Sequence, residues 1–303
     1  MAAILTRALF FFLLIVLAYV LKKAGFLKSD DSKALGKLIL YITLPSAVIS
    51  GFSSFSFTAL LLLIPLISFT ANIALEAIGY ILARGKRDSE KIFYLLNTPT
   101  YNIGNFTLPF SSGFLGPDGV IGTCLFDMGA SFLTLSGCYA FTSAVLKREG
   151  ERSLLKDVLK IFTKPAFDAY IIMIILSLLG LKMPSFIIDF ASFISPANGV
   201  LAMLMIGLML DFRLKKNDLL PVFKTIFIRI VFASVLALLV YNFLPLALEM
   251  RRAVVITLFS PISSSSAAFV TELNGNNEQA GFAGSLSIII SLLIYVTFFI
   301  IWL

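Results

Sequence analysis

The sequence of 303 residues contains no histidine, and only 14% of its residues are charged. Without histidine the chain has no His-ligated metal site, no Ser–His or Cys–His nucleophile pair and no histidine proton relay. Hydrophobic residues make up 59% of the chain and the mean hydropathy is +0.98, whereas soluble domains are about half apolar and a quarter charged. The composition therefore excludes a soluble globular protein and predicts a polytopic membrane protein.

Cysteine is scarce as well. The two cysteines, Cys124 and Cys138, would lie roughly 20 Å apart on one helix. A disulfide requires Cα atoms about 4.4–6.8 Å apart, so these two cannot bridge each other. We interpret both as buried packing residues.

Ten apolar runs are long enough to cross about 30 Å of hydrocarbon. They cover residues 3–21, 35–51, 59–83, 91–115, 119–146, 165–181, 186–210, 219–243, 252–273 and 280–303. The predicted fold class is therefore an all-α polytopic membrane protein with ten transmembrane helices, and the lipid bilayer is an expected partner.

The net charge of +7 is carried by particular loops. Nineteen of the 24 lysines and arginines fall in residues 21–37, 84–91, 147–164 and 213–224. With ten spans these segments share one side, so the positive-inside rule places them in the cytoplasm and both termini outside. We expect a bacterial inner-membrane location and no nucleic-acid partner. Arg7 and Arg229 are expected near helix ends, where they can snorkel.

The prolines indicate an internal repeat. Pro45 and Pro196 are separated by 151 residues, and Pro109 and Pro261 by 152, each about half of the chain. Five spans per half is an odd number, so the second half enters the membrane from the opposite side, an inverted repeat typical of secondary transporters. We predict repeats of residues 1–151 and 152–303, joined by the basic loop 147–164.

Two spans are predicted to be broken helices that cross at mid-membrane. Residues 97–109 hold two prolines, a glycine and three asparagines, and residues 260–266 hold a proline and five serines. Proline and glycine interrupt a helix, and the freed backbone groups must face protein, water or substrate. Helix N-termini meeting there favour an anionic guest, although simple kinking and small-residue packing is an alternative. The predicted substrate-binding residues are Asn102, Gly104, Asn105, Pro109, Pro261, Ser263, Ser264 and Ser265.

Acidic residues inside spans are candidates for ion coupling, because a lone carboxylate in a membrane is costly. Asp127 shares a helical face with Ser131 and Thr134, which predicts a site for H⁺ or Na⁺. Glu76 is expected either to pair with Arg84 or to join an ion site. No cofactor and no metal centre are expected.

The fourth-span motif resembles that of the auxin efflux carrier family, which includes plant PIN-type exporters and bacterial malate and malonate permease-like carriers. The family pattern, roughly Asn-x-Gly-Asn-x-Gly-x-x-x-Pro, is similar to Asn102-Ile103-Gly104-Asn105-Phe106-Thr107-Leu108-Pro109. Thr107 replaces the second glycine, and the proline comes earlier. The Leu44-Pro45 pair and Pro261 also match in placement.

The resemblance implies the ten-helix fold shared with bile acid/sodium symporters. In that fold a panel, here residues 1–58 and 164–213, faces a core, here residues 59–146 and 219–303, which moves in an elevator-like manner. Asn102, Asn105, Pro109 and Pro261 then map to the helix crossing, and a homodimer is common. The symporters carry Glu and Gln in the ninth helix where this chain has Ser263–Ser266, which favours the efflux-carrier branch.

These observations predict a secondary transporter of a small organic anion, such as a mono- or dicarboxylate. An intramembrane enzyme is disfavoured, since no lysine is expected mid-span and Asp127 has no acidic partner on its helix. A ligand-binding membrane sensor, a passive channel and a sodium-coupled symporter of the bile-acid type remain as alternatives.

Overall fold

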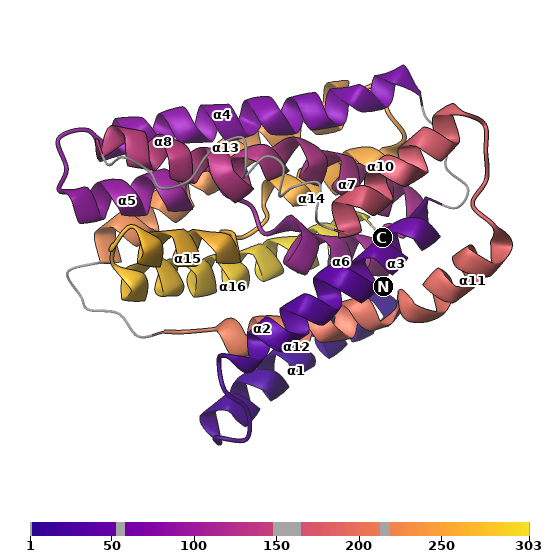
Figure 1. The fold of residues 1–303 in the computed structure, drawn as a ribbon, viewed down its shortest axis with the longest axis horizontal. Coiled ribbons are helices and arrows are strands. Elements are labelled where there is room, and N and C mark those ends of the chain that lie inside the picture. The colour runs from indigo at the N-terminus through magenta and orange to yellow at the C-terminus, as the bar shows by residue number, and fades with distance from the viewer. Residues whose placement is uncertain (1, 53–57, 148–164, 213–218, 303) are drawn as a thin grey trace.

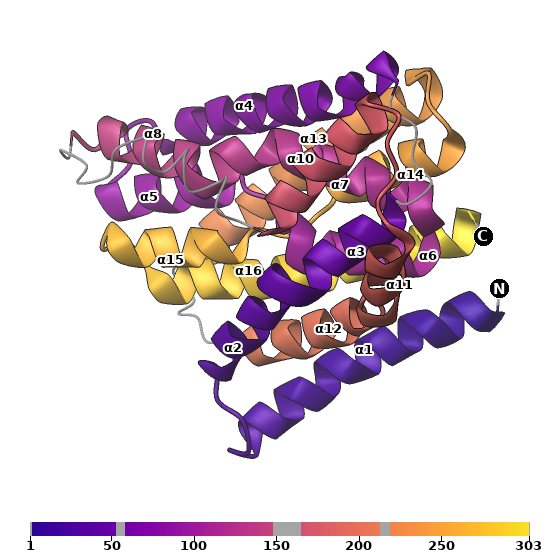
Figure 2. The ribbon, with the colours of Figure 1, turned by 45° about the vertical axis from the view of Figure 1, so that its right-hand side comes forward.

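The computed structural model describes residues 2–52, 58–147, 165–212 and 219–302, and these residues form helices and their connections without any strand. Figure 1 shows the ribbon, and Figure 2 shows it turned by 45°. Five of the described helical segments are long and apolar enough to cross a membrane. They are Asp31–Gly51, Ala59–Ala83, Ser185–Met209, Leu219–Phe243 and Asn277–Trp302. The all-helical class is confirmed, while the ten spans and the inverted repeat stay predictions.

The first half of the chain is built from eight α-helices and four short segments of tighter or wider helix, within its described part. The elements are α1 (Ala2–Lys23), α2 (Asp31–Leu38), η1 (Ile39–Thr43), α3 (Leu44–Gly51), η2 (Ala59–Leu62), α4 (Leu63–Ala83), α5 (Asp88–Asn97), η3 (Ile103–Thr107), α6 (Leu108–Phe114), α7 (Gly116–Phe132), η4 (Leu133–Gly137) and α8 (Cys138–Val145).

The second half is built from seven α-helices within its described part. Its described elements are α10 (Pro165–Leu178), α11 (Ser185–Ile194), α12 (Ala197–Met209), α13 (Leu219–Phe243), α14 (Leu248–Leu258), α15 (Ser264–Glu272) and α16 (Asn277–Trp302). Residues 148–164 of the predicted hinge and residues 213–218 of the basic segment 213–224 lie outside the described residues.

Two π-helical turns are direct consequences of proline. Pro45 and Pro109 each stand second in a helix that follows a π-helical turn, η1 and η3 respectively. A proline has no N–H and its ring clashes with the preceding turn, so that turn widens to i→i+5 bonding. Thus Leu44 N donates to Ile39 O, and Leu108 N donates to Ile103 O.

Close helix packing depends on glycines at two places. A Cβ on Gly129 of α7 would lie 2.2 Å from Pro65 O on α4. A Cβ on Gly207 of α12 would lie 2.2 Å from Ile15 O on α1. Small residues let membrane helices approach backbone to backbone, and α1 runs beside α12 in this way (Figure 2).

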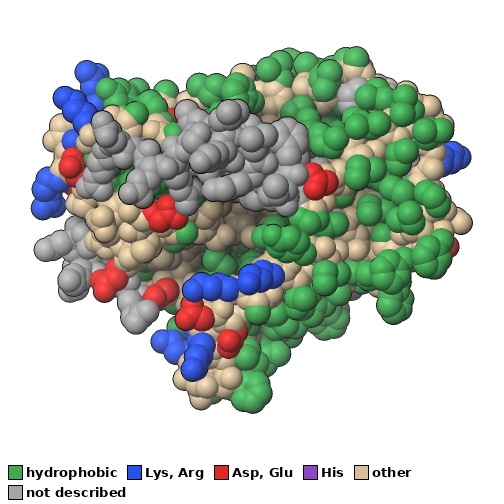
Figure 3. All heavy atoms as spheres, viewed as in Figure 1, with side chains coloured by type: hydrophobic (Ala, Val, Ile, Leu, Met, Phe, Trp, Pro, Cys, Tyr) green, Lys and Arg blue, Asp and Glu red, His purple; other side chains and the backbone are tan. Residues whose placement is uncertain are grey.

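The two ends of the molecule differ in charge. Both termini lie at one end, and the α1–α2 and α4–α5 connections lie at the other (Figure 2). Charged side chains gather over those two connections in Figure 3, whereas apolar side chains cover much of the remaining face. This arrangement agrees with the predicted topology; the orientation in the bilayer stays a prediction.

Candidate functional site

The two helix interruptions predicted from proline and polar residues are present and touch each other. The backbone between α5 and η3 is non-helical, and so is the backbone between α14 and α15. The Asn102 N–H, just before η3, donates a hydrogen bond of 2.9 Å to Pro261 O. One unsatisfied backbone group of each interruption therefore satisfies the other, as buried polar backbone requires.

Buried hydroxyls reinforce this crossing. Thr107, Ser260 and Tyr295 form a hydrogen-bonded triangle, with 2.8 Å from Thr107 to Tyr295 and 3.3 Å from Ser260 to Tyr295. Ser266 donates to the Asn97 side-chain oxygen at 2.8 Å and so joins α15 to α5. Sequence reasoning missed this network. The signal available was Thr107 itself, a hydroxyl at the position where the family pattern has glycine.

The side-chain amides of Asn102 and Asn105 are available at the crossing. In the described part of the chain neither amide has a hydrogen-bond partner, and the Asn105 Oδ1 is buried. Gly104 lies between them, where a Cβ would come within 3.3 Å of Leu44 on α3. Pro109 lies at the start of α6 and is buried. The structure thus brings Asn102, Gly104 and Asn105 together at one helix start.

The predicted serines lie at the start of α15. Ser263 is its N-cap, and its hydroxyl accepts from the Ser265 N–H at 3.3 Å. The Ser265 hydroxyl lies 2.8 Å from that of Ser263 and donates weakly to Thr134 O at 3.4 Å. Ser264 is half-buried, and its hydroxyl has no hydrogen-bond partner in the described part of the chain. The N-terminal end of a half-helix, with its partial positive charge, therefore opens at the crossing.

Ser263→Ala is expected to lower the free energy of unfolding by about 1 kcal/mol, because the α15 N-cap is lost. Ser264→Ala is the matched control and should change it by less than roughly 0.5 kcal/mol. Thermal unfolding of the two purified variants side by side measures the difference. Equal stabilities would show that Ser263 does not cap α15.

Arg229 was predicted near a helix end, and that prediction is wrong. The residue lies near the middle of α13 and is only 7% exposed. Its guanidinium donates to Thr98 O at 2.6 Å and to Ser260 O at 2.9 Å, one carbonyl from each interruption. It also lies 4.9 Å from the centre of the Tyr101 ring, a favourable cation–π distance.

Arg229 compensates the carbonyl ends of two half-helices. Thr98 follows the last residue of α5, and Ser260 follows shortly after α14, so both carbonyls belong to C-terminal ends with partial negative charge. No described carboxylate pairs with Arg229. A buried positive charge therefore lies at the crossing itself.

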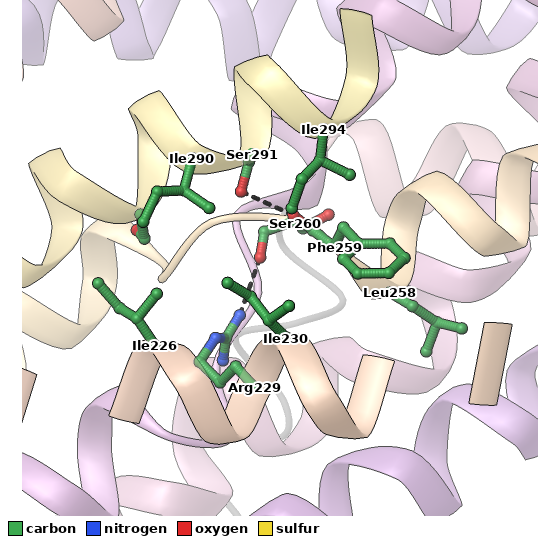
Figure 4. Close-up of a pocket in the computed structure, with 10 residues that line it drawn as sticks. Ile226, Arg229, Ile230, Leu258, Phe259, Ser260, Ile290, Ser291 and Ile294 are labelled. Carbon is green, nitrogen blue, oxygen red and sulfur yellow. Dashed lines mark hydrogen bonds between the residues drawn. The ribbon is translucent and has the colours of Figure 1, made fainter. Parts of the chain in front are cut away.

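The cavity beside Arg229 is too small for an organic substrate. Figure 4 shows Arg229 and Ser260 at its rim, with the Ser291 hydroxyl donating to Phe259 O at 2.7 Å. The cavity volume is about 20 Å³, enough for one water molecule. Arg229 is therefore a positioning residue behind the crossing, and it does not line a pocket of substrate size.

The predicted ion-coupling residues lie on two helices, α4 and α7. Ser131 donates its hydroxyl to the backbone carbonyl of Asp127, at 2.7 Å within α7. Glu76 lies on another helix, α4, where it is buried, and neither of its carboxylate oxygens has a hydrogen-bond partner among the described residues. The alternative in which Glu76 pairs with Arg84 is therefore not formed.

Comparison with known proteins gives a consistent picture. A family model described as "Membrane transport protein" matches residues 3–301. An uncharacterised transporter of Methanocaldococcus jannaschii is 29% identical over 66% of this chain and 66% of its own length. An uncharacterised transporter of Methanothermobacter thermautotrophicus is 27% identical over 68% of this chain and 67% of its own length. The matched regions span about two thirds of each relative.

Proposed function

This chain belongs to the membrane transport protein family, the family of the auxin efflux carriers, and we propose that it is a secondary transporter of a small organic anion. The substrate class is a mono- or dicarboxylate, bound where the two interrupted helices cross. The observation that carries the proposal is the Asn102–Pro261 hydrogen bond, which ties both interruptions into one site.

Three features support an anion as the substrate. The starts of η3 and α15 meet the crossing with partially positive N–H groups. The side-chain N–H groups of Asn102 and Asn105 make no hydrogen bond in the described part of the chain and can donate to an anion, while the buried Asn105 Oδ1 is an acceptor without a partner. Arg229 neutralises the negative ends of α5 and α14, so these ends do not oppose an anion at the positive ends of η3 and α15. A cation at the crossing would be repelled by the partial positive charge of these helix N-termini.

Ion coupling is proposed for Glu76, Asp127 and Ser131, with H⁺ or Na⁺ as the coupled ion. Among these the burial of Glu76 is the stronger argument, because a buried carboxylate without a donor must take up a proton or bind a cation. Ser131 contributes by fixing the helix turn at Asp127.

The proposed motion carries a core of residues 59–146 and 219–303 past a panel of residues 1–58 and 164–213. The hydrogen bonds at the crossing, including the one from Ser266 to Asn97, join elements that all belong to the core. The contact of Gly104 with Leu44 lies on the boundary with the panel, where a small residue permits sliding. A homodimer is part of the proposal.

The test is thermal stabilisation of the purified protein by malate, malonate and aromatic acids, each with and without Na⁺ and at two pH values. A ligand that binds only the folded state raises the melting temperature with concentration. We expect a shift with at least one anion, lost in the Asn102→Leu/Asn105→Leu variant. The Asn102–Pro261 bond uses backbone atoms, so this variant keeps it.

Asn242→Leu is the matched control, since that exposed asparagine bonds only within α13. The same anions should raise its melting temperature as much as they raise that of the unmodified protein. Stabilisation that persists in the double variant would remove the crossing as the binding site. The absence of any shift with anions, together with a shift for a cationic or neutral solute, would overturn the substrate class.

A further inference from the structure

A long apolar cavity lies between α1 and α16, away from the crossing. It is bounded by α1 from Ala8 to Tyr19 and by α16 from Ile288 to Val296, and its volume is about 440 Å³. Leu9 and Phe12 of α1 are about half exposed, whereas Ile15 is buried. The length of α1 along the cavity is roughly 16 Å, about half of a 30 Å hydrocarbon core. The cavity therefore matches one leaflet of a bilayer.

The cavity leads into a second one that carries positive charge. This second cavity, of about 340 Å³, shares Tyr19, Leu210 and Phe212 with the first and is also lined by Lys22 and Lys23. Asp211 is the one acidic residue in its lining, so the ammonium groups exceed the carboxylates by one. An apolar slot of leaflet length thus ends at a basic pocket.

The two lysines differ in their roles. Lys22 donates to Leu208 O at 2.9 Å and to Leu210 O, and so caps the C-terminal end of α12. Lys23 is exposed, with its ammonium 5.6 Å from the centre of the Tyr19 ring. Lys22 holds the pocket in shape, and Lys23 is the charge most accessible to a ligand.

We propose that the two connected cavities bind one anionic phospholipid, with an acyl chain between α1 and α16 and its phosphate beside Lys22 and Lys23. Charge complementarity supports this occupant, because basic pockets next to apolar helix surfaces attract anionic headgroups. The predicted topology places the lysines on the cytoplasmic side, where anionic lipid is the expected partner. The site is independent of the transported solute.

The test compares phosphatidylglycerol with phosphatidylcholine of the same acyl chains, added to the detergent-solubilised protein. Native mass spectrometry measures bound lipid, and thermal unfolding measures stabilisation. We expect phosphatidylglycerol to bind and stabilise more than phosphatidylcholine. Lys23→Gln should weaken phosphatidylglycerol binding about fivefold, because one lysine near an anionic surface contributes roughly 1 kcal/mol. Val16→Trp should fill the apolar cavity and weaken both lipids.

Lys37→Gln is the matched control: it removes one exposed lysine from the same basic segment, outside both cavities. It should bind phosphatidylglycerol like the unmodified protein. Equal binding of the two lipids, or equal effects of Lys23→Gln and Lys37→Gln, would overturn the proposal. A change in oligomeric state with Val16→Trp, without any change in lipid binding, would assign the cavity to a second copy of the chain and overturn it too.

Discussion

Arg229→Met is expected to lower the free energy of unfolding by about 3 kcal/mol and to weaken anion binding roughly tenfold. The stability loss follows because Thr98 O and Ser260 O both lose a charged donor, and an unsatisfied buried carbonyl costs roughly 1–3 kcal/mol. The affinity loss follows because a unit charge about 10 Å away, at an effective dielectric near 20, contributes about 1.7 kcal/mol. Thermal unfolding and ligand titration measure the two effects separately.

Arg229→Lys separates charge from geometry. Lysine keeps the positive charge but cannot reproduce the planar fork that reaches both carbonyls. The stability of Arg229→Lys should therefore lie between those of Arg229→Met and the unmodified protein. Its anion affinity should stay within about threefold of that of the unmodified protein. Lys224→Met is the control, since it removes an exposed cation from the same helix. If Arg229→Met unfolded no more readily than Lys224→Met, the carbonyl contacts would contribute nothing to the fold.

Gly129→Ala and Gly207→Ala are expected to destabilise the protein by about 3 kcal/mol or more each. In both cases the new Cβ would lie 2.2 Å from a backbone carbonyl oxygen of the neighbouring helix, Pro65 O or Ile15 O. A backbone atom cannot rotate away as a side chain can, so the helix pairs must separate, at the upper end of the cost of overpacking. The yield of monodisperse protein and its melting temperature measure this loss.

Gly281→Ala is the control for these substitutions. No atom lies within 4 Å of a Cβ at Gly281 on α16, and alanine is the better helix former by roughly 1 kcal/mol. This variant should be as stable as the unmodified protein or slightly more so. A melting temperature for Gly129→Ala equal to that of Gly281→Ala would mean that α4 and α7 do not pack backbone to backbone.

Hydropathy predicts the long helices well, because length and apolar content decide them locally. The predicted spans 59–83 and 219–243 coincide with Ala59–Ala83 and Leu219–Phe243. The predicted spans 35–51 and 280–303 begin four and three residues later than the observed helices. The observed helices begin at Asp31 and Asn277, and their first turns contain polar residues. A search for apolar runs leaves such residues out, although the first turn of a helix accommodates them.

The candidate site is predictable only in part. Proline with glycine and asparagine marks the first interruption from the sequence alone, and proline with serines marks the second; both interruptions occur at these segments. The burial of Arg229 is not predictable in this way, because its partners are carbonyls 131 and 31 residues away in the chain. A hydropathy argument places arginine near the end of a membrane helix. Here two backbone carbonyls and the Tyr101 ring stabilise Arg229 near the middle of α13. The same holds for Tyr295, which bonds Thr107 across 188 residues.

The π-helical turns also affect how the chain tolerates changes in length. Each of η1, η3 and η4 accommodates one residue more than an α-helical turn would. Losing one residue at η4, which no proline follows, restores i→i+4 bonding and leaves α8 facing as before. At η1 and η3 the proline keeps the turn wide. A deletion elsewhere in α3, α6 or α8 would instead rotate every later side chain of that helix by about 100°, because 3.6 residues make one turn. Single-residue gaps between related chains should therefore collect at η4.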